Sequence, residues 1–569
     1  MIIFKTANIH KILIIGLLGF ISCSTRHFSP YNFTSIKHAE SSKGMVATAH
    51  PLASEVGIRI LKKGGNAVDA AIAVQFALAV VYPGAGNIGG GGFLLFQSND
   101  GKIVALDFRE KAPRLSTADM YLDVNGNAID HASKFGPLSS GVPGSVDGMV
   151  TAFQDHSKLR NWKALIQPAI DLAENGFSIT ENEATMLNYN QNHFENNNRF
   201  VTAFHGNWKR GDKLVQLELA QTLKLIRDEG RNGFYQGKVA QDIVDEMRAN
   251  GGLISLEDLS NYHSKWREPI MSNYRGFTVA SMPPPSSGGI CLSQLLQMVE
   301  PYELEKMGYH STDAVHLMIE AERRVYADRA KHLGDSDFYS VPTKKLLNSA
   351  YNLGRMTDFD PDRASTSVGI TAGDTESTET THVSIVDKEG NAVSMTTTLN
   401  GAYGSFTVVK GSGFLLNNEM DDFSVKAGVP NMFGLIGAEA NKIEPEKRML
   451  SSMTPTIVSK DKKVHIVVGS PGGSTIITSV FQVIVNIIDF KMSVSDTVQS
   501  KRFHHQWLPD KVFLEPNTFN EVTQKLLELK GHSFSERDQI GRVEAILIDH
   551  KGMRFGASDQ RGDDCVLGY

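Results

Sequence analysis

Cysteine is scarce in this sequence, and its scarcity excludes several classes of protein. Among 569 residues only Cys23, Cys291 and Cys565 occur, too few for a disulfide framework or a cysteine-based metal site. Cys291 lies in the apolar run GGICLSQLL, which favours a buried thiol. A disulfide between Cys291 and Cys565 is the alternative. We therefore expect the fold to depend on a hydrophobic core.

No charge of one sign dominates the chain. Lys and Arg number 57 and Asp and Glu number 63, for a formal net charge of −6. Nucleic-acid binding needs concentrated positive charge, so no nucleic-acid partner is expected. Hydrophobic residues at 41% and charged residues at 21% are ordinary globular usage. This composition excludes a disordered chain, a collagen and a polytopic membrane protein.

Several well-known catalytic motifs are absent. No P-loop, no H-E-x-x-H and no G-x-S-x-G occurs, which removes the simplest cases for an NTPase, a zinc protease and an α/β-hydrolase. Residues 84–89 match G-x-G-x-x-G, but a predicted helix precedes them and a strand follows, the reverse of a dinucleotide site. We interpret them as a connection with close backbone packing. The pair His504-His505 is expected to be structural, because neighbouring side chains point apart.

The N-terminus resembles a bacterial export signal. Lys5 and Lys11 make the first residues positively charged. Residues 12–21 then form an apolar run that is too short to span a bilayer of about 30 Å as a helix. Ser22-Cys23 resembles a lipoprotein processing site, although Phe20 stands where such signals usually carry Leu. We predict export, with a signal over residues 1–22, a lipid on Cys23 and a polar tether over 23–44. A signal cleaved without lipidation and an uncleaved anchor are the alternatives.

From Met45 onward the pattern is typical of a layered α/β sandwich. Residues 66–81 are almost wholly apolar but contain Asp69 and Gln75, which predicts a buried core helix capped by Asn66. Residues 145–260 are mostly helical around an Asn-rich loop near 188–198. Further helices are predicted over 54–63, 312–331 and 474–490, and strands over 93–97, 103–108, 382–386, 392–399, 456–459, 464–468, 544–549 and 554–557. A Ser/Thr/Gly-rich stretch over 364–381 predicts an exposed loop.

The boundary between that loop and the next strand carries Thr380-Thr381-His382. A threonine there is ordinary unless the chain is cut just before it. An N-terminal threonine holds a nucleophile and a base, its own α-amine, in one residue. The α-amine has a pKa near about 7.7–8.0, so it can accept the hydroxyl proton near neutral pH.

Three other segments could serve a reaction at a carbonyl group. Gly472 and Gly473 lie between a strand and a helix, where free backbone N–H groups can hold an oxyanion. Arg109 ends a predicted strand and can grip a carboxylate through two hydrogen bonds. Residues 417–422, NNEMDD, offer acceptors for an amino group or a metal, without EF-hand spacing. Each segment alone is more often a plain turn or a solvated charge.

Long motifs in a fixed order resemble the γ-glutamyltransferase (γ-glutamyl transpeptidase) family. They are LDFREKAP, MPPPSSGG, TTHVSIVDKEGNAVSMTTTLN, LLNNEMDDFS, KRMLSSMTPT, VVGSPGGS, RFHHQWLPD and the closing ASDQRGDD. The resemblance covers residues 45–569 and implies an N-terminal-nucleophile hydrolase, a four-layer αββα sandwich. It also implies that the precursor cuts itself between Glu379 and Thr380 into a large subunit, 45–379, and a small subunit, 380–569, which stay together.

Roles follow from the matching motifs. Thr380 matches the nucleophile for self-cleavage and for attack on the γ-glutamyl amide. Thr398 and Asn400 match residues that support the nucleophile and the substrate amino group, and Gly472 and Gly473 match the oxyanion hole. Arg109, with Ser451 and Ser452, matches the residues that bind the substrate α-carboxylate. Glu419 and Asp422 match the residues that accept hydrogen bonds from the α-ammonium.

A lid is implied over residues 430–441, where bacterial members often carry Tyr in place of Phe433. The expected donors are glutathione-like, the acceptors are water, amino acids or peptides, and no cofactor or metal is implied. The expected location is the periplasm or outer surface, with membrane attachment through the lipid on Cys23. Two alternatives remain: a cephalosporin- or glutaryl-type acylase of the same fold, and a non-catalytic exported binding lipoprotein, which would stay uncut.

Overall fold

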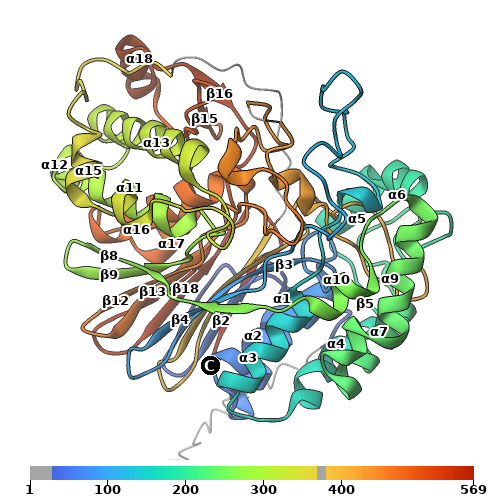
Figure 1. Ribbon diagram of the computed structural model, residues 1–569. Helices are drawn as coiled ribbons and strands as arrows, with labels where there is room; N and C mark the ends of the chain where they lie inside the picture. The colour runs from blue at the N-terminus through green and yellow to red at the C-terminus, as the bar shows by residue number, and fades with distance from the viewer. Residues whose placement is uncertain (1–28, 368–379, 427) are drawn as a thin grey trace, which may run out of the picture.

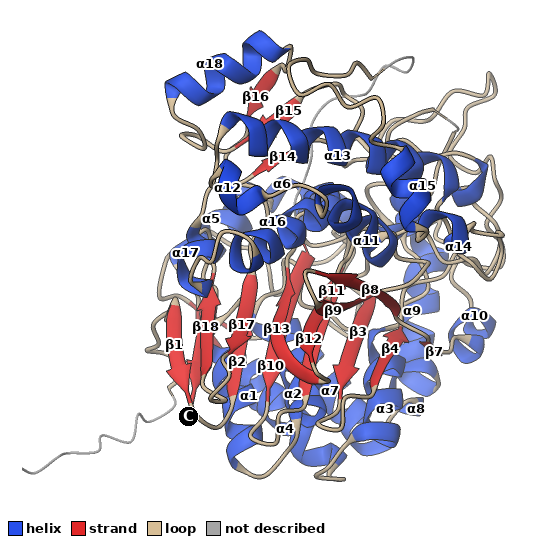
Figure 2. Cartoon of the chain, turned by 90° about the vertical axis from the view of Figure 1, so that its left-hand side faces the viewer, coloured by secondary structure: helices blue, strands red, loops and turns tan. Residues whose placement is uncertain are grey.

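A computed structural model describes residues 29–367, 380–426 and 428–569. Two seven-stranded antiparallel sheets lie between two groups of helices (Figures 1 and 2). The first sheet has the order β1 (His38–Ser41), β18 (Arg554–Ser558), β17 (Glu544–Ile548), β13 (Lys463–Gly469), β12 (Thr456–Lys460), β9 (Phe277–Ser281), β8 (Ile270–Tyr274). The second has the order β19 (Cys565–Gly568), β2 (Met45–Thr48), β10 (Thr380–Val386), β11 (Ala392–Thr398), β3 (Gly91–Gln97), β4 (Ile103–Asp107), β7 (Lys265–Arg267).

Three large apolar clusters separate the four layers. In β3, Leu94 and Phe96 face the helices on one side of the second sheet, while Phe93 and Leu95 face the first sheet. Because strand side chains alternate between faces, both faces of this strand are buried, which explains its continuous apolar run. The predicted four-layer αββα sandwich is therefore confirmed.

Each helical layer shares an apolar cluster with one sheet. On the side of the second sheet lie α1 (Pro51–Lys62), α2 (Ala67–Val81), α3 (Ser145–His156), α4 (Trp162–Asn175), α5 (Glu181–Tyr189), α7 (Leu217–Glu229), α8 (Asn232–Tyr235), α9 (Gly237–Asn250) and α10 (Leu256–Asn261). On the side of the first sheet lie α11 (Gly288–Val299), α12 (Leu304–Met307), α13 (Thr312–His332), α14 (Thr343–Leu346), α16 (Ile476–Ile488), α17 (Val494–Gln499) and α18 (Glu521–Lys530).

Helix α2 is the core helix that the sequence predicts. Asn66 caps it in a capping box with Asp69, and every residue of the helix is buried. Its two polar side chains have partners: Asp69 accepts from Ser157, and Gln75 donates to the carbonyl of Asn87. Among the described residues, no helix is both long and apolar enough to cross a membrane.

The prediction of an Asn-rich loop near 188–198 is wrong, because residues 191–197 form helix α6 (Gln191–Asn197). Asparagine is a poor helix former since its side chain competes for backbone groups. In α6 the asparagine side chains bond to backbone groups of the helix itself. Asn197 and Asn198 donate to the carbonyls four residues earlier, while Phe194 is fully buried.

Other predictions are confirmed. Cys291 and Cys565 are both buried, and neither forms a disulfide among the described residues. A side chain at Gly86 or Gly89 would collide with the carbonyl of Leu78 or Leu415, so residues 84–89 serve close packing. His504 and His505 are buried and turn to different partners, Thr478 and Asp510.

Candidate active site

Thr380 lies at the first position of β10, directly opposite Thr398 at the end of β11. Both side chains are buried, with 5% of Thr380 and 3% of Thr398 exposed. Beyond Thr398 the chain turns sharply: Asn400 has a φ of 76°, a left-handed value that asparagine tolerates well. Its backbone N–H donates to Thr398 Oγ1 at 2.7 Å, and its side chain donates to the carbonyl of Asn418 at 3.0 Å. The end of the hairpin is thereby joined to the acidic segment.

A small pocket opens at this end of the hairpin. Ten of the predicted site residues line it, although they come from widely separated parts of the chain. The lining is Arg109, Thr380, Thr398, Asn400, Glu419, Asp422, Phe433, Leu435, Ser451, Ser452, Met453, Gly473 and Ile476. Gly472 adjoins this lining, and Cys23 lies outside the described residues.

Arg109 follows β4 and is almost completely buried. Its Nη1 lies 2.5 Å from Glu419 Oε2, and its Nη2 lies 2.5 Å from Asp422 Oδ2. Its Nε donates to the carbonyl of Met449 at 3.3 Å, which fixes the plane of the guanidinium. Burial opposes the charge, but the carboxylates of Glu419, Glu110 and Asp422 together hold the pKa of Arg109 above its usual value.

Three carboxyl groups share this one guanidinium. Burial raises the pKa of Glu110 to about 7 and that of Glu419 well above its usual range, against the opposing pull of Arg109. Burial also raises the pKa of Asp422. The site is therefore short of positive charge. A ligand with both a carboxylate and an ammonium would fit, because the carboxylate could take Arg109 while the ammonium replaced it as partner of the acids.

The two serines of KRMLSS line the same pocket as Arg109, and one of them, Ser452, is held by a residue that the sequence analysis missed. Ser452 Oγ accepts a hydrogen bond from Arg329 Nη2 at 2.9 Å, and Arg329 also donates to Ser287 at 3.0 Å. Arg329 belongs to α13, whose charges suggest only a solvated amphipathic helix. Only packing reveals that this arginine is buried.

Gly472 and Gly473 form a tight turn between β13 and α16. Both have left-handed φ values, 135° and 54°, and Gly473 begins a short 3-10 helix, residues 473–475. In the described part of the chain neither backbone N–H meets an acceptor. A Cβ on Gly473 would lie 2.4 Å from Phe433 Cδ1. The turn thus offers free donors directly beneath the ring of Phe433.

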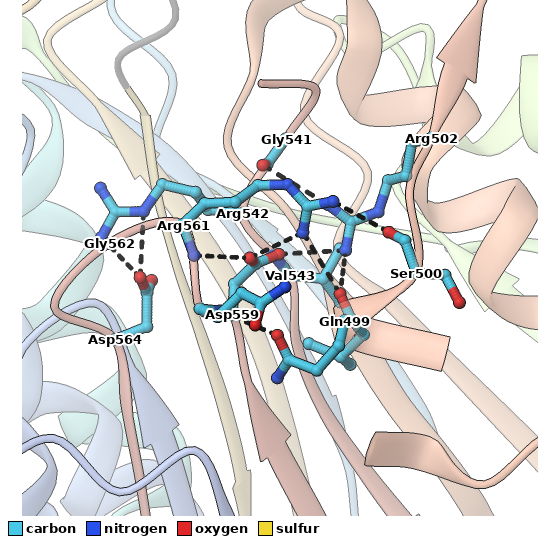
Figure 3. Close-up of polar contacts among 12 residues, drawn as sticks. Gln499, Ser500, Arg502, Gly541, Arg542, Val543, Asp559, Arg561, Gly562 and Asp564 are labelled. Carbon is cyan, nitrogen blue, oxygen red and sulfur yellow. Dashed lines mark hydrogen bonds and ion pairs between the residues drawn. The ribbon is translucent and has the colours of Figure 1, made fainter. Parts of the chain in front are cut away.

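The closing motif ASDQRGDD supports this turn from behind, a role that the motif alone did not suggest. Arg542 donates its backbone N–H to Ser470 Oγ at 3.0 Å, two residues before the glycines. Its guanidinium is held by Asp564 at 2.8 Å, next to the network in which Asp559 lies between Arg502 and Arg561 (Figure 3). Buried ion pairs of this kind fix position more than they add stability.

Histidines take no direct part in the pocket lining. His382 is buried between Thr396 and Ser384, and burial lowers its pKa to about 3, so it stays neutral. One group in the described residues, His316, Glu320 and His532, is close enough to bind a metal ion. Most of its polar atoms already have partners, although His532 Nδ1 has none among the residues described. His316 bonds to His532 at 2.7 Å, and Glu320 pairs with Arg323 and Arg324.

Comparison with known proteins identifies what the chain is similar to. Residues 53–569 match the family model described as Gamma-glutamyltranspeptidase. The Glutathione hydrolase proenzyme of Escherichia coli K12 is 46% identical over 538 residues, covering 93% of this chain and 92% of that protein. The crystal structure of Helicobacter pylori gamma-glutamyltranspeptidase is 45% identical with a TM-score of 0.54, covering 56% of this chain and 92% of that chain. Cephalosporin acylase from Bacillus halodurans has a TM-score of 0.81 at 26% identity, covering 95% and 99%.

Proposed function

The chain belongs to the γ-glutamyltranspeptidase family, and from this membership we propose a self-processing γ-glutamyl hydrolase and transferase whose nucleophile is Thr380. The chain is an enzyme with the N-terminal-nucleophile hydrolase fold. Its donors are glutathione-like γ-glutamyl compounds.

One observation carries the assignment of residues. Thr380 shares a pocket with Arg109 and with the two acids that pair with it, Glu419 and Asp422. A carboxylate partner and ammonium partners placed beside a nucleophile suit an amino acid whose side-chain carbonyl reacts. The γ-glutamyl group is such an amino acid.

The proposed mechanism begins with self-cleavage. Thr380 Oγ attacks the carbonyl carbon of Glu379, and the peptide C–N bond breaks, so that the acyl group passes to Oγ as an ester and the α-amine of Thr380 is freed, carrying the proton lost by the hydroxyl. Water then hydrolyses the ester, which releases Glu379 as a carboxylate and restores the Thr380 hydroxyl. Strands of the two proposed subunits pair with each other in both sheets. In the second sheet β2 lies between β19 and β10, and β11 pairs with β3; in the first sheet β1 pairs with β18 and β9 with β12. This interleaving would keep the two subunits together after the cut.

In the proposed catalytic cycle the freed α-amine accepts the Thr380 hydroxyl proton as Oγ attacks the γ-carbonyl carbon. The N–H groups of Gly472 and Gly473 would stabilise the oxyanion. The leaving amine takes the proton and departs, leaving a γ-glutamyl ester on Thr380. Water or an amino acid then attacks the ester, giving glutamate or a new γ-glutamyl amide, so ping-pong kinetics are expected.

An acylase specificity is the second candidate, because cephalosporin acylase shares the fold. An acyl group without an amino-acid head has no ammonium to offset Glu419, Asp422 and Glu110 around one arginine. Burying such excess acid without a counter-charge is costly. The γ-glutamyl assignment is therefore preferred.

Export, with a lipid on Cys23 after removal of residues 1–22, belongs to the same proposal. It rests on the N-terminal sequence, which lies outside the described residues.

The test is the intact mass of the denatured protein, followed by assays with γ-glutamyl anilide and glutaryl anilide on the same sample. Two chains, the smaller starting at Thr380, with anilide release from the γ-glutamyl compound only, are expected. Cleavage with preference for the glutaryl compound would favour an acylase, and an uncut inactive chain would favour a binding protein.

A further inference from the structure

We propose that Asn431 is a positioning residue that links the lid to the carboxylate that recognises the substrate ammonium, so that the lid contributes to the selection of amino-acid over simple dicarboxylate ligands. The inference rests on the proposed function, because it assumes that Asp422 receives the ammonium.

Asn431 organises the lid turn through its side-chain oxygen. Residues 430–436 form a tight turn in which Pro430 and Ile436 bridge, and Gly434 donates to the Asn431 carbonyl at 3.0 Å. Asn431 Oδ1 accepts from the backbone N–H groups of Phe433 at 3.0 Å and Leu435 at 3.1 Å. One side chain therefore fixes the two lid residues that line the pocket.

The other end of the same amide reaches the site. Asn431 Nδ2 donates to Asp422 Oδ1 at 3.0 Å, while the second oxygen of Asp422 faces Arg109. When a substrate carboxylate occupies Arg109, Asp422 loses part of its cationic partner. The bond from Asn431 would keep Asp422 oriented while its free oxygen meets the ammonium.

The lid in turn covers the reacting centre. The ring of Phe433 lies against Gly473, and Gln506 Nε2 donates to the Phe433 carbonyl at 3.3 Å. Met432 is tied down separately, since its N–H donates to Asp421 Oδ2 at 2.8 Å. The contacts of Phe433 and Met432 involve Gln506 and Asp421, whereas the bond from Asn431 is made to Asp422, the carboxylate assigned to the substrate ammonium.

The experiment compares two ligands that differ only in the ammonium: L-glutamate and glutarate, as competitive inhibitors of γ-glutamyl anilide hydrolysis by the mature enzyme. Asn431→Ala should raise the inhibition constant of glutamate about tenfold and that of glutarate less than twofold. The KM of the γ-glutamyl substrate should rise with that of glutamate, while kcat changes less.

Three variants separate the linkage from a general loosening of the lid. Gln506→Ala removes a lid contact without touching Asp422, so it should change both inhibition constants by the same factor. Asn431→Asp keeps the acceptor for the turn but sets a carboxylate against Asp422, and should also lower the preference for glutamate. Glu439→Gln, an exposed change in the same segment, should leave both constants unchanged.

An unchanged or increased preference for glutamate in both Asn431 variants would overturn the inference. Failure of the proposed function looks different: the wild-type enzyme would then not hydrolyse γ-glutamyl anilide at all.

Discussion

Arg109 and Glu419 form a fully buried ion pair, with 2.5 Å between Nη1 and Oε2, in the lining of the proposed substrate pocket. Asp422 completes the group on the other guanidinium nitrogen. Arg109 thus already has carboxylate partners, and each of the two acids a cationic one, without a ligand. Binding a zwitterion exchanges these contacts for equivalent ones, so the desolvation cost of the charges is met before the substrate arrives.

Replacing Thr380 with valine should give one uncut chain without activity, because the methyl group keeps the shape of the side chain but removes the nucleophile. Thr381→Val is the matched control. Its hydroxyl is buried and unpartnered among the described residues, so this variant should cut itself and remain active. Intact mass and γ-glutamyl anilide turnover check both. Two chains from Thr380→Val would contradict the assignment.

Arg109→Lys should raise the KM for γ-glutamyl substrates at least tenfold, because lysine cannot grip a carboxylate through two parallel bonds. Arg109→Ala should in addition lower the free energy of unfolding by about 3–5 kcal/mol, since it leaves buried acids unpaired. Steady-state kinetics and chemical denaturation measure the two effects. Wild-type kinetics in both variants would remove Arg109 from the site.

Glu183 makes stability depend on pH. Burial raises its pKa to about 8, whereas the pKa in the unfolded chain is about 4.3. Between about pH 4.3 and about pH 8 the folded state therefore binds a proton that the unfolded state has lost. Its contribution to stability is therefore complete below pH 4 and falls as pH rises towards 8. Each unit of difference between the folded and the unfolded pKa corresponds to about 1.4 kcal/mol in the free energy of unfolding. Glu183→Gln should stabilise the protein at pH 8 but not at pH 4, by urea denaturation. Equal effects at both pH values would contradict this.

Gly473→Ala should reduce kcat by about tenfold or more, because the new Cβ meets the Phe433 ring at 2.4 Å and the φ of 54° disfavours a side chain. The double variant with Phe433→Ala removes the clash but keeps the backbone strain. If kcat partly recovers in the double variant, the clash with the lid causes the loss. If kcat does not recover, the changed oxyanion turn causes it.

Cys23→Ser should abolish incorporation of a labelled lipid precursor while leaving the mature enzyme's kinetics unchanged. Metabolic labelling and mass spectrometry of the N-terminus test this. Absence of lipid in the wild-type protein would leave plain export as the remaining interpretation.

Much of the local structure follows from the sequence. The cap at Asn66, the apolar length of α2 and the short apolar run of β3 are local features, which nearby residues determine. The Asn-rich helix α6 escaped prediction because its side chains bond within their own helix and Phe194 anchors it in the core.

The sequence by itself determined the residue types of the site, through motifs whose order identifies the family. It could not place Arg329, Arg542 or Asn431, which carry no signal distinct from an ordinary helix or loop. Only the tertiary structure brings Arg329 to Ser452, Arg542 to the glycine turn and Asn431 to Asp422. These contacts depend on how layers far apart in the chain pack together, and side-chain packing is a property of the whole fold rather than of any local pattern.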